Sequence, residues 1–126
     1  MRSGRGVRKL VMDDDAVGGT VVHLWSVRHR HRTDGPCAEV LSLTREGTTA
    51  TVRLVFRGGE GRFVPDGFLP SGAVALGGSA ALNLHEPGVV RAFADEAGRR
   101  GLLHGPAELD GWDLFPQVAA RRAADG

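Results

Sequence analysis

The spacing of apolar residues changes once along this chain, and that change constrains the fold most strongly. Before Asn83, apolar side chains alternate with polar ones; after it, they recur every three to four residues. Alternation is the period of a half-buried strand, and the longer spacing is that of an amphipathic helix. Strands followed by helices predict an α+β fold: an antiparallel sheet of four to five strands with two C-terminal helices packed on one face.

The clearest local pattern is a β-hairpin formed by residues 37–45 and 49–57. Leu41 and Leu43 share one face of the first strand, and apolar residues take alternate positions in the second. The intervening Glu46-Gly47 is a typical connection between paired strands. We also predict a strand over residues 20–32, a turn over 33–36, and a second hairpin over 73–84.

Two helices are predicted in the C-terminal third. The first begins at Pro87, because proline is favoured in the first turn, and it ends at Gly101. The second runs from Asp113, as its N-cap, to about Ala123.

The first nineteen residues predict a disordered N-terminal tail, and residues 20–126 a single α+β domain. The tail sequence is rich in Arg and Gly and then acidic, with no periodicity, so it buries too little apolar surface to offset the entropy of ordering. A chain of 126 residues suits one hydrophobic core. Met12 is a second candidate for the natural start of the chain.

Composition excludes several classes of function. A single cysteine, Cys37, rules out a disulfide within the chain and a multi-cysteine zinc site. No segment approaches eighteen consecutive apolar residues, and the acidic run after Met12 does not fit a signal peptide. We therefore expect a cytoplasmic protein with no membrane partner. Sixteen basic against fifteen acidic residues give a net charge of +1, so we do not expect a nucleic-acid partner.

His29 and His31 are the first candidates for chemistry. Residues i and i+2 of a strand point the same way, so both imidazoles can reach one metal ion. The candidate third ligand is Glu39, across the following turn, and His23, His85 and His104 are the alternatives, because no spacing fixes the choice. The competing interpretation, which we favour from the residues alone, is a solvated strand end rich in Arg and His.

A basic patch is the second candidate. The run of arginines at the end of the first predicted strand, with two arginines from a neighbouring strand, suits phosphate or nucleic acid. Its members are Arg28, Arg30, Arg32, Arg53 and Arg57. A charged strand edge that resists aggregation explains the same run.

Two further features have a structural and a functional interpretation. Apolar side chains on the loop at residues 63–69, chiefly Phe63, Phe68 and Leu69, either fold over the core or bind a partner. Cys37 is an activated thiol if Arg32 or His31 supplies a positive environment; we favour a small, partly buried thiol at the start of a strand.

The C-terminal half resembles small α+β proteins of unknown function from GC-rich, actinobacterial-type genomes. The resemblance rests on the segment from Leu82 to Val90, on Arg100-Gly101 and on Asp110-Gly111-Trp112. It covers about a third of the chain and implies only a fold style, a few strands followed by a helix that begins with an x-Pro-x-Val pattern.

No convergent catalytic set stands out, so the sequence favours a non-enzymatic binding or protein-interaction module. We expect a protein partner or self-association through a sheet edge, and no cofactor. The alternatives are a metal-dependent enzyme that uses His29 and His31, and a phosphate or nucleic-acid binder that uses the arginines at 28–32.

Overall fold

The computed structural model describes residues 7–14, 18–31, 33–65 and 71–125. Its main sheet has the strand order β1-β2-β3-β4-β8, antiparallel throughout except that β8 runs parallel to β4. The strands are β1 (Arg8–Asp14), β2 (Gly19–Arg30), β3 (Ala38–Arg45), β4 (Thr51–Arg57) and β8 (Ala107–Asp110).

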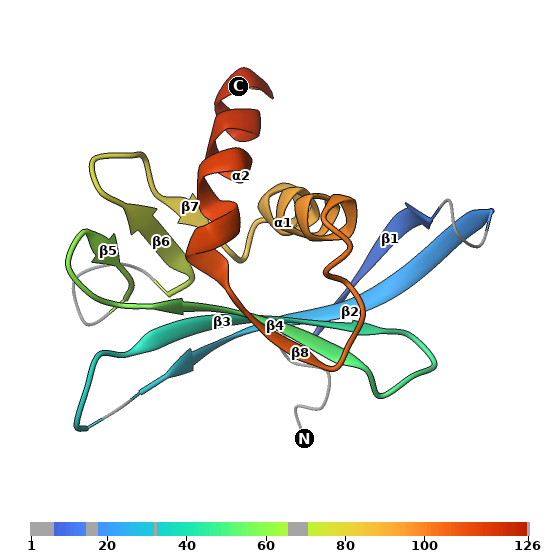
Figure 1. Cartoon of the computed structure of the whole chain (residues 1–126), viewed down its shortest axis with the longest axis horizontal. Helices are drawn as coiled ribbons and strands as arrows, with labels where there is room; N and C mark the ends of the chain where they lie inside the picture. The colour runs from blue at the N-terminus through green and yellow to red at the C-terminus, as the bar shows by residue number, and fades with distance from the viewer. Residues whose placement is uncertain (1–6, 15–17, 32, 66–70, 126) are drawn as a thin grey trace.

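The remaining described strands and both helices lie on one side of this sheet (Figure 1). A small second sheet has the order β5-β6-β7. Its strands are β5 (Arg62–Phe63), β6 (Ala73–Leu76) and β7 (Leu82–Asn83). The helices are α1 (Pro87–Arg99) and α2 (Gly111–Asp125). The predicted α+β fold, with both helices on one face of a mostly antiparallel sheet, is therefore confirmed.

The core fills the space between the helices and the main sheet. Phe56 of β4 contacts the ring of Phe93 edge-on at 5.3 Å between centroids, and that of Trp112 at 5.2 Å. Each such aromatic pair contributes about 0.5–1.5 kcal/mol beyond the burial of its area. This cluster joins β4 to both helices, so it fixes where the helices sit on the sheet.

The first residue of α2 packs directly on that cluster. A Cβ atom at Gly111 would lie 2.5 Å from two carbons of the Phe56 ring. Asp110 Oδ1 accepts the backbone N–H of Trp112 at 3.0 Å, which satisfies one free donor at the helix start. The prediction that this helix begins at Asp113 is therefore wrong: the helix begins two residues earlier, and its first turn is supported by Asp110.

The prediction of a disordered tail over residues 1–19 is wrong for residues 8–14, and residues 1–6 and 15–17 lie outside the described residues. Residues 8–14 form β1, which pairs with β2 along its length. Leu10 and Met12 are 7% and 6% exposed and belong to the core, while the polar side chains of Lys9 and Asp13 lie at the surface. The charges of Lys9 and Asp13 suit an edge strand, because charged side chains on an edge oppose further pairing.

None of the described helices is long and apolar enough to cross a membrane.

Candidate metal centre

The hairpin of β2 and β3 brings the chemically distinctive side chains together at one end. Its register places His29 directly opposite Glu39 and Leu41 opposite Val27. Continuing this antiparallel register by two residues sets His31 opposite Cys37. Side chains at every second position share a face, so these four lie on the same face as buried Leu41, the face covered by the helices.

The buried carboxylate of Glu39 orients the ring of His29. The Glu39 side chain has 0% exposure, and its Oε1 lies 2.6 Å from Nδ1 of His29. A carboxylate only accepts hydrogen bonds, so Nδ1 carries the proton and Nε2 presents its lone pair. A carboxylate behind a histidine is the arrangement that fixes the tautomer and ring orientation of metal ligands.

The second oxygen of Glu39 is held by the backbone of the smaller sheet. Oε2 accepts the N–H of Gly72 at 2.9 Å. Gly72 has φ +85°, and a Cβ there would lie 2.5 Å from the ring of His85. Only glycine fits this position, because the conformation is left-handed and the ring is already in contact. The buried carboxylate is thus hydrogen-bonded on both oxygens.

Cys37 completes the cluster. Its Sγ lies 3.4 Å from Nδ1 of His31, and one ligand atom from each of His29, His31 and Cys37 lies within 4.8 Å of the others. A tetrahedral zinc ion holds its nitrogen and sulfur ligands about 3.3–3.6 Å apart. The Cys37–His31 pair already has that spacing, and a ligand atom of His29 lies within 4.8 Å of both. No other trio of metal-ligating side chains in the described part of the chain lies so close.

The sequence predicted a metal site with His29 and His31 as ligands and Glu39 as the candidate third ligand. In the structure Glu39 is hydrogen-bonded to Nδ1 of His29, and the third side chain of the cluster is Cys37. The signal for this was present in the hairpin: a turn centred on residue 34 pairs 31 with 37 and 29 with 39.

The basic residues lie on the other face of the sheet. The cross-strand register sets Arg28, Arg30, Arg53 and Arg57 on the face opposite to the helices, while Arg32 lies outside the described residues. Acidic residues of β8 share that face, and Glu108 pairs with Arg30 at 3.7 Å. The arginines and the histidines therefore cannot form one site.

The loop predicted to bind a partner is described only in part. Phe63 of β5 is 49% exposed. Phe68 and Leu69 lie outside the described residues, so their placement is not known.

Comparison with protein-family models, with curated proteins and with solved structures finds no match to this chain.

Proposed function

We propose that this protein binds a divalent transition metal ion, with zinc as the first candidate, through His29, His31 and Cys37. The observation that carries the proposal is the convergence of three such ligand atoms within 4.8 Å, one of them on a ring held by a fully buried carboxylate. Imidazole and thiolate are the ligands that zinc prefers in proteins.

The three ligands leave a fourth tetrahedral position for a water molecule or a bound ligand. Three protein ligands with one open position are typical of catalytic rather than structural zinc sites. His31 is exposed and Cys37 half-buried, so this position is accessible from solvent. Of the functions that the sequence left open, the geometry therefore supports a metal-dependent one best. A protein partner or self-association stays a prediction.

The direct test is a titration of the metal-free protein with Zn²⁺ and, separately, with Co²⁺. We expect one ion per chain, and with Co²⁺ a thiolate-to-metal charge-transfer band, because the sole cysteine is a ligand. Cys37→Ser and His31→Ala should each raise the Kd by more than about 100-fold, since loss of a ligand exceeds the 10–100-fold effect of changing an orienting group.

The matched control is His104→Ala, which removes an exposed imidazole far from this hairpin end. It should leave both the Kd and the charge-transfer band unchanged. Absence of binding, or binding that survives Cys37→Ser and His31→Ala, would overturn the proposal. In that case the pair at 3.4 Å is only a thiol–imidazole hydrogen bond.

A further inference from the structure

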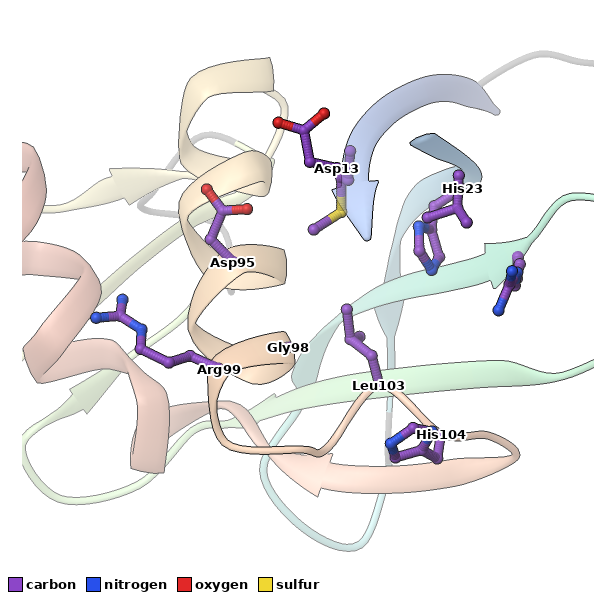
Figure 2. A pocket seen from close by; sticks show the side chains of 10 residues that line it. Asp13, His23, Asp95, Gly98, Arg99, Leu103 and His104 are labelled. Carbon is purple, nitrogen blue, oxygen red and sulfur yellow. The ribbon is translucent and has the colours of Figure 1, made fainter. Parts of the chain in front are cut away.

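A cavity lies at the opposite end of the same sheet face, between the last turns of α1 and the strands β1 to β3 (Figure 2). Its volume is about 470 Å³, and a smaller hollow of about 240 Å³ adjoins it. Ligand pockets in proteins span roughly 300–1,000 Å³. His23 and His29 are six residues apart on β2, so this cavity and the metal centre are separated by about 20 Å.

The two hollows share one set of lining residues: His23, Arg45, Leu103 and His104. His23 and Arg45 are directly opposite each other in the β2–β3 register, so their side chains leave the same face as close neighbours. In Figure 2 the His23 ring and the Leu103 side chain both point into the space between α1 and the strands. His104 comes from the loop that precedes β8.

Arg45 supplies the positively charged group of this cavity that a ligand can bind. No carboxylate oxygen of the described residues lies within 4.0 Å of its guanidinium, the distance limit of an ion pair. The adjacent acid, Glu46, is paired with Lys9 at 3.3 Å. Arg99 also lines the cavity, but its guanidinium binds Glu96 at 2.9 Å and points away in Figure 2.

The rest of the lining mixes apolar side chains with polar ones, and the acids lie only in the larger hollow. Met12, Val21 and Leu103 line that hollow together with Asp13 and Asp95. Asp95 already lies 3.8 Å from both Arg91 and Arg121. The smaller hollow has no acidic lining residue among those described. A guanidinium with the exposed imidazole of His104 on the same cavity wall suits one carboxylate, and the acids of the larger hollow disfavour a second negative charge.

We infer that this cavity binds a small monocarboxylate with an apolar body, its carboxylate on Arg45 and His104 and its hydrocarbon against Leu103, Met12 and Val21. The site is independent of the metal centre and of the function proposed for it. Its lining combines an unpaired guanidinium with the apolar side chains of Met12, Val21 and Leu103.

Three probes with the same six-carbon chain test the inference: hexanoate, hexylamine and 1-hexanol. Calorimetric titrations are run without added metal, so that coordination at His29, His31 and Cys37 does not contribute. We expect hexanoate to bind at least about 10-fold more tightly than either analogue, because only its carboxylate can accept paired, charge-assisted hydrogen bonds from the Arg45 guanidinium. Arg45→Gln should reduce the affinity for hexanoate to that for hexanol.

Arg53→Gln is the matched control, since Arg53 is exposed on the other face of the sheet. It should leave hexanoate binding unchanged. If hexanol binds as tightly as hexanoate, the site is only an apolar hollow. If hexylamine binds more tightly than hexanoate, Asp13 and Asp95 determine which ligand charge the cavity prefers. Either result, no binding of hexanoate at all, or an Arg45→Gln variant with unaltered affinity would overturn the inference.

Discussion

Glu39→Gln is the substitution that best separates metal binding from folding. Glutamine has nearly the same shape as glutamate, so its oxygen can still accept the Gly72 N–H, which now lies 2.9 Å from Oε2. Its NH₂ group then faces Nδ1 of His29, which lies 2.6 Å from Oε1 in the native protein. An amide nitrogen only donates, so Nδ1 must present its lone pair and the ring proton moves to Nε2.

The metal needs the lone pair on Nε2. Binding must therefore either return the proton to Nδ1 or take place with a His29 ring that residue 39 no longer orients. Two donors then face each other in a buried place, at a cost of about 1–3 kcal/mol. This agrees with the 10–100-fold loss of affinity, about 1.4–2.7 kcal/mol, that follows changes in groups that orient metal ligands. We expect the Kd for Zn²⁺ to rise about 10–100-fold. The metal-free free energy of unfolding should fall by less than about 1 kcal/mol, because both hydrogen bonds persist.

Competition with a chromophoric chelator measures the Kd, and urea denaturation with EDTA present measures the metal-free stability. Glu46→Gln, at a half-exposed acid paired with Lys9, is the control and should alter neither. An unchanged Kd in Glu39→Gln would refute the role of the His29 tautomer. A loss of several kcal/mol in the metal-free protein would show instead that Glu39 mainly holds β3 to the smaller sheet.

Three other outcomes test the fold and the site. Saturating Zn²⁺ should slow the alkylation of Cys37, the sole thiol, at least about 10-fold, as measured by mass spectrometry over time. An unchanged alkylation rate would argue against the thiolate as a ligand. Gly111→Ala should lower the free energy of unfolding by about 1–3 kcal/mol in urea, because its Cβ would lie 2.5 Å from the Phe56 ring; an unchanged midpoint would contradict this packing. The hydrogen bond from Arg100, with the charges of nearby arginines, holds the pKa of Glu96 below its ordinary value although burial raises it. A group with a lowered folded pKa stabilises the protein above its unfolded pKa, and this stability is lost as the pH falls through the folded pKa. Glu96→Gln should therefore be less stable than the native protein at neutral pH, by about 1 kcal/mol, and the difference should vanish in acid; a constant difference would refute the linkage.

Long elements with a clear period were predictable from the sequence. The hairpin at 37–57 and the helix that begins at Pro87 have repeated apolar spacing and recognisable ends, and both are present as β3, β4 and α1. Short elements without such a pattern were not predictable. The four residues of β8 become a strand because the chain returns after α1 and pairs parallel with β4.

β1 was not predicted for a related reason. Its charged residues resemble a tail when they are counted along the sequence, and only pairing with β2 shows that Leu10 and Met12 face the core. Whether one face of a strand is buried depends on what packs against that face of the sheet. The composition of the strand does not show this, so an edge strand is easily taken for a tail.

The sequence by itself determined that His29 and His31 leave one face of a strand, because the side-chain period of a strand is two. It also determined the α+β class, through the change of period at Asn83. Only the tertiary structure decided which residues meet the histidines. A slip of one residue in the β2–β3 register would carry Cys37 and Glu39 to the opposite face. The register, together with the Gly72 N–H from a distant strand pair, made Glu39 the support and Cys37 the third candidate ligand.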